Sequence, residues 1–293
     1  MRYVQLRAFH HVAIHGGFSR AAEALFLTQP AISDQVRKLE DEYDILLFDR
    51  HKRQVSLTEK GKQLLEITNR LFDNEQQALD FLTESQALRA GELRMIVDSA
   101  YHVTSVLRIF QSHYPGIRIS LKVGNSQEVI DALYAYRADI GVLGEVIKAH
   151  DLKVLPLDET PLVAFASRRG EHQNLVLSDY RQLATLPLVM REKGSKTRQK
   201  LEEAAKACGV TLTPAIEAEG REAVREIVAA GNGVGFVSTA EFAPDERLAT
   251  IDLPAPVPMM HEALICMKER QNRKLIKTFM ALASGLAKNP PGT

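Results

Sequence analysis

The chain has 293 residues, enough for two or three domains rather than a single core. Its 37 basic and 37 acidic side chains cancel, so any nucleic-acid surface must be a local feature. No apolar stretch reaches the roughly 18 residues that a membrane-spanning helix needs, and the N-terminus lacks the pattern of a signal peptide. The two well-separated cysteines suit a reducing compartment, so we expect a cytoplasmic protein without a membrane partner.

The N-terminal region shows apolar side chains at helical spacing. A first helix over residues 6–15 is expected to end at Gly16. Ser19 is the expected N-cap of a short second helix. Thr28 is the expected N-cap of a third helix, which has Pro30 in its first turn.

The third helix has a buried apolar stripe and a polar opposite face. Two short helices, a tight turn and such a third helix make a helix-turn-helix, whose last helix fits the major groove of DNA. Double-stranded DNA is therefore a predicted partner. The side chains expected at the DNA are Ser19, Arg20, Thr28, Gln29, Pro30, Ser33, Asp34 and Arg37.

A basic tip follows the third helix. Strand-like runs at 46–48 and 55–57 flank Arg50-His51-Lys52-Arg53. We interpret these runs as a β-wing in which Arg50, Lys52 and Arg53 contact phosphates or the minor groove. A solvated charged turn is the alternative for such a run taken alone, but its place directly after a helix-turn-helix favours DNA.

The sequence resembles LysR-type regulators in motifs that cover nearly all of its first sixty residues. These motifs are Leu6-Arg7-Ala8-Phe9, Gly17-Phe18-Ser19-Arg20-Ala21-Ala22-Glu23-Ala24-Leu25, Thr28-Gln29-Pro30-Ala31-Ile32-Ser33, Gln35-Val36-Arg37-Lys38-Leu39-Glu40, Leu47-Phe48-Asp49-Arg50 and Leu57-Thr58-Glu59-Lys60-Gly61. The resemblance implies DNA reading through the third helix and the wing. Asp34 departs from the family pattern: its carboxylate would either repel phosphate or accept a hydrogen bond from cytosine N4.

A long helix is predicted from Thr58 to about Ser85. Two apolar rows of period seven lie on it, Leu64/Leu71/Ala78 and Leu65/Phe72/Leu79. They suggest a coiled-coil-like seam between two subunits, and packing on the same chain is the alternative. The LysR resemblance implies a homodimer through this helix and a homotetramer built from two dimers.

From Gly91 onward, short apolar strands alternate with helices, which predicts mostly parallel α/β sheets. The expected strands are 93–97, 117–123, 140–143, 162–166, 186–190, 216–218, 235–237 and 263–267, and the expected helices are 101–113, 126–136, 195–208, 221–230 and 272–286. They form two Rossmann-like lobes joined by crossing strands, similar to periplasmic binding proteins of type II, which close on a ligand by hinge motion. The LysR resemblance implies the same effector fold.

The predicted domains follow from these elements. They are a winged helix-turn-helix at 1–57, a linker helix at 58–90, and an effector domain at 91–293 whose lobes are 91–161 plus 265–293 and 162–264.

Ligands of open α/β sheets lie at the carboxyl ends of strands, near helix N-termini. Loops at 98–102, 124–126 and 191–198 occupy such places, and the last has hydroxyls, N–H groups and cations suited to an anion. Solvated helix caps are the alternative. The residues expected at a small anionic effector are Ser99, Tyr101, His102, Asn125, Ser126, Glu145, Arg191, Ser195, Thr197, Arg198 and Arg221.

A narrower resemblance is to the LysR-type regulators associated with 2-aminoethylphosphonate catabolism. It rests on Tyr101-His102-Val103, Gly124-Asn125-Ser126-Gln127-Glu128-Val129, Tyr136-Arg137-Ala138-Asp139, Arg191-Glu192-Lys193-Gly194-Ser195 and Arg221-Glu222-Ala223-Val224-Arg225-Glu226. It implies a ligand with a phosphonate and an amine, and the residues would serve a carboxylate metabolite almost equally well. The segment 34–40 also fits this branch.

Two other functions compete with a ligand-controlled regulator. One is an α/β enzyme with a fused DNA-binding domain, and the other is an architectural nucleoid protein. No nucleophile elbow and no metal-ligand spacing appear, so we predict no enzyme, no cofactor and no metal site. His11 and His15 lie four residues apart, but without a third ligand they are better interpreted as surface imidazoles.

Overall fold

The structure is a computed structural model, and it describes residues 1–49, 55–82, 88–147, 149–172 and 175–288. The chain divides into two compact units, Met1–Thr83 and Glu84–Thr293. In the described part of the chain, no helix combines the length and the apolar character needed to cross a bilayer.

The first unit begins with three helices, α1 (Tyr3–His15), α2 (Phe18–Leu25) and α3 (Gln29–Tyr43). They pack around a shared core that includes Phe9, Val12, Ile32 and Val36, all at most 1% exposed. The helical spacing of these apolar side chains explains why the three helices form together.

The helix ends differ in part from the predictions. Gly16 ends α1 in the left-handed region, at φ 66°, as expected for a residue without Cβ. The expectation that Ser19 caps α2 is wrong, because the helix begins at Phe18 with Gly17 as its N-cap. Thr28 does occupy the N-cap of α3, but its side chain accepts no backbone hydrogen bond there.

Two short antiparallel strands follow, β1 (Phe48–Asp49) and β2 (Ser56–Leu57). They are shorter than the predicted runs, although the strand pair itself is confirmed. Arg50, Lys52 and Arg53, predicted at the wing tip, lie outside the described residues.

The linker helix α4 runs from Glu59 to Leu82. Leu64, Leu65 and Phe72 are half-buried and pack against the core of the first unit, which fits the alternative of packing on the same chain. Leu71 and Leu79 are 41% and 48% exposed. The members of the two predicted rows therefore differ in exposure, and a seam between two subunits stays a prediction.

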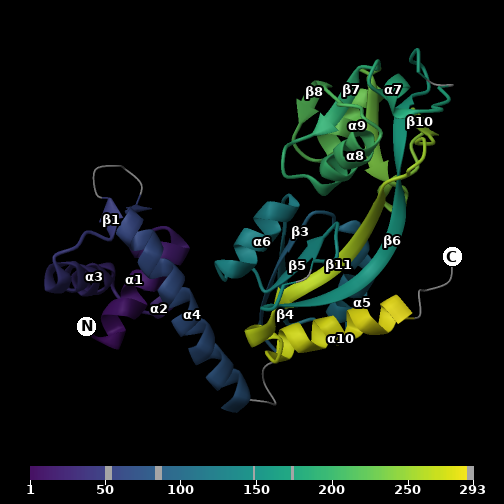
Figure 1. Cartoon of the computed structure of the whole chain (residues 1–293). Helices are drawn as coiled ribbons and strands as arrows, with labels where there is room; N and C mark the ends of the chain where they lie inside the picture. Colours follow the sequence, from purple (N-terminus) through teal and green to yellow (C-terminus); the bar gives the residue numbers. More distant parts are fainter. Residues whose placement is uncertain (50–54, 83–87, 148, 173–174, 289–293) are drawn as a thin grey trace. The chain divides into compact units, whose positions relative to one another are not determined.

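The second unit contains a continuous nine-stranded sheet (Figure 1). Its path is β4-β3-β5-β11-β6-β9-β7-β8, with β10 paired to β6. The strands are β3 (Gly91–Val97), β4 (Ile117–Val123), β5 (Ile140–Leu143), β6 (Leu152–Ser167), β7 (Leu188–Arg191), β8 (Pro214–Ala218), β9 (Val234–Ser238), β10 (Leu248–Ile251) and β11 (Met259–Met267).

Helices cover this sheet, and each lobe has its own cores. They are α5 (Thr104–His113), α6 (Ser126–Tyr134), α7 (Tyr180–Leu183), α8 (Lys196–Ala207), α9 (Arg221–Ala229) and α10 (Lys274–Lys288), with short 3-10 turns η1 (Tyr101–Val103), η2 (Thr239–Glu241) and η3 (Lys268–Arg270). The buried residues of the first lobe lie in 93–152 and 264–283, and those of the second lie in 162–260. The predicted two-lobed α/β effector fold is confirmed, but the expectation of mostly parallel sheets is wrong: β11 pairs antiparallel with β5 and β6, and β6 pairs antiparallel with β9 and β10.

Two long strands, β6 and β11, run side by side and pass from one lobe into the other (Figure 1). Only their ends at 162–166 and 263–267 were predicted. Pro156 and Pro161 interrupt the apolar alternation of β6, which hides its first half from a pattern search. The register of the pair shifts between Glu262 and Ala263, the mark of a β-bulge.

Candidate functional site

The polar face of α3 has the composition of a groove-reading surface. Gln29, Pro30 and Arg37 are exposed, and Ser33 is half-buried. Ser19 and Arg20 are exposed on α2, where Arg20 donates a hydrogen bond of 2.6 Å to the Gly16 carbonyl. The side chains predicted at DNA that lie in the described part of this unit are therefore all at least partly accessible to solvent.

The negative charge of Asp34 is paired with positive charges on its own helix. Its carboxylate lies 2.6 Å from Lys38 Nζ and 3.4 Å from an Arg37 nitrogen. The hydrogen bond from Lys38 lowers the pKa of Asp34, so the group stays ionised but paired. Repulsion of phosphate, one of the two roles considered for this residue, is weakened by these pairs.

Of the two α1 histidines predicted as surface imidazoles, His15 is exposed, whereas His11 is not fully at the surface. His11 and His15 stack with ring centroids 5.6 Å apart. His11 is half-buried, and burial is the main cause that lowers its pKa to about 4.

In the second unit, the N-termini of α6 and α8 approach each other from different lobes. Asn125 caps α6 and accepts a hydrogen bond of 3.1 Å from Glu128 N. Gly194, just before α8, has φ 96°, and a Cβ placed on it would lie 3.4 Å from the Asn125 side chain. A side chain at 194 would strain the backbone and crowd this contact between lobes.

Unpartnered hydroxyls surround these helix ends. Ser126 and Ser195 are 3% and 2% exposed, and their Oγ atoms have no hydrogen-bond partner among the described residues. Thr197, in the first turn of α8, is 4% exposed. Helix N-termini with free N–H groups favour anions, and a buried hydroxyl without a partner costs stability until something binds it.

The loop after β3 brings Asp98, Ser99 and His102 beside the second lobe. Asp98 is 3% exposed, its carbonyl accepts a hydrogen bond from Arg221, and its Oδ1 has no described partner. Burial raises the pKa of Asp98. Ser99 Oγ accepts from Tyr101 N at 3.3 Å, whereas the Tyr101 side chain points outward and the residue is 56% exposed.

The predicted cations are already paired. Arg221 Nε lies 2.8 Å from Glu241, and Lys196 lies 2.8 Å from Glu145. Arg191 pairs with Glu192 at 2.5 Å. Any anionic ligand here must share these groups or replace their carboxylates.

The Arg198 side chain belongs to a network of its own, and Arg191 is the predicted site residue that it contacts there. It donates hydrogen bonds to Glu202 at 2.8 Å, to Glu217 at 2.6 Å and to the Arg191 carbonyl at 2.9 Å. The side chain is 8% exposed and ties α8 to β7 and β8. These bonds occupy its guanidinium within the second lobe, and its predicted contact with an effector stays a prediction.

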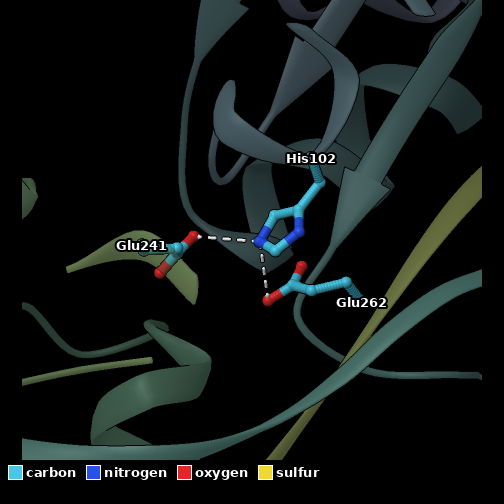
Figure 2. A group of neighbouring side chains, drawn as sticks. All are labelled: His102, Glu241 and Glu262. Atoms are coloured by element: carbon cyan, nitrogen blue, oxygen red, sulfur yellow. Dashed lines mark ion pairs between the residues drawn. The ribbon is translucent and has the colours of Figure 1, made fainter. Parts of the chain in front are cut away.

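A cluster of His102, Glu241 and Glu262 lies between the lobes (Figure 2). His102 Nε2 is 3.4 Å from Glu241 and 3.5 Å from Glu262, and the three side chains are 2%, 2% and 0% exposed. Burial, together with Asp98 and Glu241, raises the pKa of Glu262 to about 9. Burial also opposes ionisation of Glu241, but contacts with His102 and Arg221 hold its pKa at about 2.

The two glutamates of this cluster escaped the sequence analysis. Glu241 comes from η2, three residues after the end of β9, and Glu262 lies within β11; neither belongs to a recognised motif or to the loops considered as ligand sites. Only the folded sheet brings them to His102.

A cavity of about 350 Å³ extends from this region into the second lobe. Arg221 and Glu241 line it on the polar side, and Phe165, Phe236 and Phe242 line it on the apolar side. There is room beside the polar groups for the carbon part of a small ligand.

The chain matches two family models in succession. Residues 3–62 match the bacterial regulatory helix-turn-helix protein, lysR family, and residues 86–287 match the LysR substrate binding domain. The HTH-type transcriptional activator CmpR of Synechocystis is 31% identical over 281 residues, which are 94% of this chain and 92% of CmpR.

Solved structures agree on the fold. Full-length OxyR from Pseudomonas aeruginosa, solved as a variant with aspartate in place of one cysteine, has a TM-score of 0.78 at 20% identity, with 97% of this chain and 94% of that one covered. The CcmR regulatory domain of Synechocystis, solved in complex with 2-PG, has a TM-score of 0.61 at 25% identity and covers 69% of this chain and all of its own. These families and relatives are transcriptional regulators and not enzymes, and this chain belongs to the LysR family of bacterial transcriptional regulators.

Proposed function

We propose that this regulator binds promoter DNA through α3 and the wing, and that a small anionic metabolite held between the effector lobes controls its activity. The observation that carries the ligand proposal is the pair of buried, unpartnered hydroxyls, Ser126 and Ser195, beside helix N-termini of opposite lobes. An anion bound there satisfies both hydroxyls and the free N–H groups, and it does so only when the lobes are close.

Our specific candidate is 2-aminoethylphosphonate or a related phosphonate. A phosphonate has several acceptor oxygens for the hydroxyls of Ser126, Ser195 and Thr197. Asp98 lies close to the loop after β5 and to the start of α8. A Cβ atom placed on Gly144, in that loop, would lie 3.1 Å from Asp98 Oδ2 and 3.4 Å from the Cβ of Lys196, the first residue of α8. Its unpartnered Oδ1 is suited to the amine of such a ligand.

Binding can be tested by calorimetric titration of the full chain. We expect saturable binding of 2-aminoethylphosphonate, weaker binding of ethylphosphonate because it lacks the amine, and a loss of about fivefold to tenfold in affinity for Ser195→Ala. Equal affinity for both compounds would remove Asp98 from the site. If only a carboxylate or phosphate ester such as 2-PG binds, the anion site stands and the phosphonate assignment fails.

The DNA surface is tested by footprinting of fragments selected from a random pool. Arg37→Ala should weaken operator binding about tenfold, since one side chain that reads a base contributes about 1–3 kcal/mol. Ligand affinity should stay unchanged, because Arg37 lies in the first unit. Equal binding to every duplex by the unmodified chain would instead indicate an architectural nucleoid protein.

Exposed apolar side chains along α4 support a homodimer. Ile67, Leu71 and Leu79 are 57%, 41% and 48% exposed on one helix, and two subunits that cover these side chains place two DNA-reading helices for adjacent half-sites. We propose that dimers pair further into a homotetramer through the effector units, and that ligand binding alters this pairing.

A further inference from the structure

The cluster of His102, Glu241 and Glu262 is buried but lacks the hydrogen bonds that buried polar groups normally make. His102 Nε2, Glu241 Oε1 and both carboxylate oxygens of Glu262 have no hydrogen-bond partner among the described residues. Two carboxylates with side chains at most 2% exposed face one another across an imidazole (Figure 2). Burial of charge at this level requires compensation by a counter-charge, a proton or a ligand.

Burial raises the pKa of Glu262 to about 9, so a proton on Glu262 is one form of compensation, and distance distinguishes three others. A protonated imidazole that donates to a carboxylate has N···O of about 2.7–2.9 Å, shorter than the 3.4 Å and 3.5 Å found here. Acceptors around an ammonium nitrogen, each about 2.8 Å from it, would lie about 4.6 Å apart. Ligand atoms about 2.1 Å from a tetrahedral metal ion lie about 3.4 Å apart. The two measured separations match the metal.

The three ligand atoms lie within 4.8 Å of one another. We propose that His102 Nε2, Glu241 Oε1 and one oxygen of Glu262 bind a divalent first-row transition-metal ion between the effector lobes. One imidazole and two carboxylates suit Zn²⁺ or Mn²⁺ better than Ca²⁺ or Mg²⁺, which prefer oxygen ligands alone.

The surroundings of the cluster support the assignment. Arg221 Nε donates to Glu241 Oε2 at 2.8 Å, which orients this carboxylate and leaves Oε1 facing the cluster. Such outer contacts to a ligating carboxylate are usual at metal sites. Beside Glu262 the pairing of β11 with β6 is interrupted, because β6 has one extra residue, Leu157, and such bulges are common next to functional sites.

The ion would connect the lobes. His102 lies in η1, which packs with the first lobe, whereas Glu241 lies in η2 beside the cavity of the second lobe. Glu262 lies on the strand that crosses between them. A metal bound to all three stabilises the arrangement in which the lobes approach, and it thereby couples metal availability to effector binding.

The test is direct metal binding by the full chain without an affinity tag, after dialysis against EDTA and then against metal-free buffer. Titration calorimetry with ZnCl₂ and MnCl₂, and metal content by mass spectrometry, should show one ion per chain. Because loss of an outer-shell group already lowers metal affinity about 10–100-fold, His102→Ala and Glu262→Gln should each lower it by about 100-fold or more. His113→Ala removes an exposed histidine of α5 and should leave affinity unchanged.

The outcomes separate this proposal from the proposed function. Cooperative unfolding of the variants in urea shows that their second unit folds, and ethylphosphonate provides an anion readout that does not depend on the amine. Absence of saturable Zn²⁺ and Mn²⁺ binding overturns the metal site, as does equal binding by His102→Ala and Glu262→Gln. If no metal binds and Glu262→Gln weakens 2-aminoethylphosphonate selectively, the cluster binds an amine and the metal proposal is wrong.

Discussion

The second unit buries two groups of charge that are satisfied to very different degrees. Asp139, 4% exposed, accepts hydrogen bonds from Arg94 at 2.8 Å and from the fully buried Arg270. The cluster of His102, Glu241 and Glu262 is buried just as deeply, yet both carboxyl oxygens of Glu262 and Oε1 of Glu241 have no hydrogen-bond donor among the described residues, and only Oε2 of Glu241 accepts from Arg221. A buried charge with its partners in place indicates a structural role, whereas one without them indicates a ligand.

The largest effect is expected at the satisfied group. Arg270→Met leaves the Asp139 carboxylate buried without its most deeply placed partner, so the free energy of unfolding should fall by about 3–5 kcal/mol in urea titrations. Arg94→Met is the matched control: Arg94 is 39% exposed, and water replaces much of what it provides. A loss at Arg270 no greater than at Arg94 would contradict the structural role.

Low pH should remove the contribution of Asp139 to the stability of the fold. Although burial opposes its ionisation, hydrogen bonds and charges from Arg94 and Arg270 lower the pKa of Asp139 to about 2. A lowered folded-state pKa stabilises the protein above the unfolded value of about 3.9, and the contribution disappears as pH falls toward 2. We expect a loss of about 2 kcal/mol from this residue between pH 5 and pH 2, measured as the difference in slope between the unmodified chain and Asp139→Asn.

Removing a carboxyl group from the cluster of His102, Glu241 and Glu262 should raise the free energy of unfolding, whereas removing a partner of Asp139 lowers it. Glu262→Gln removes a buried carboxylate next to Glu241 and Asp98, so unfolding in EDTA should become about 1 kcal/mol more costly. Added Zn²⁺ should reverse the order, because it stabilises only the chain that retains Glu262. A large destabilisation in EDTA would show that Glu262 has a structural partner after all.

The smallest expected effects on stability come from two buried serine hydroxyls, one with a hydrogen-bond partner and one without. Ser238 is fully buried and its Oγ lies 2.7 Å from Thr160 Oγ1, so Ser238→Ala should destabilise by about 1 kcal/mol. Ser195→Ala removes a buried hydroxyl without a described partner and should change the ligand-free stability by less than about 0.5 kcal/mol. Equal losses would mean that Ser195 serves the fold and not a ligand.

Features that depend on local sequence signals could be predicted from the sequence, whereas contacts between distant segments could not. The helix-turn-helix and the strands around Ile117 and Ile140 were predictable because their signals are local: apolar period, caps and turn residues. The positions of Ser126 and Ser195 at the N-termini of α6 and α8 were predictable from the order of strands and helices, and their contact with a ligand stays a prediction.

The remaining features depend on contacts between distant segments. The pairing of Glu241 with His102 and Glu262 joins three parts of the chain that only the crossing strands bring together. Arg198 lies in the predicted loop, but Glu217, nineteen residues further along the chain, is one of its partners. No local pattern indicates whether a charged side chain will find its partners, and that is the property on which the candidate site depends.

The most direct test of ligand control is footprinting of a selected operator with and without 2-aminoethylphosphonate, for the unmodified chain and for the double variant Ser126→Ala and Ser195→Ala. The expected result is a ligand-dependent change in the protected region or its affinity that the double variant loses, while binding without ligand stays the same. A footprint that no phosphonate, carboxylate or phosphate ester alters, or one that the double variant still changes to the same extent, would contradict a ligand site at these two hydroxyls.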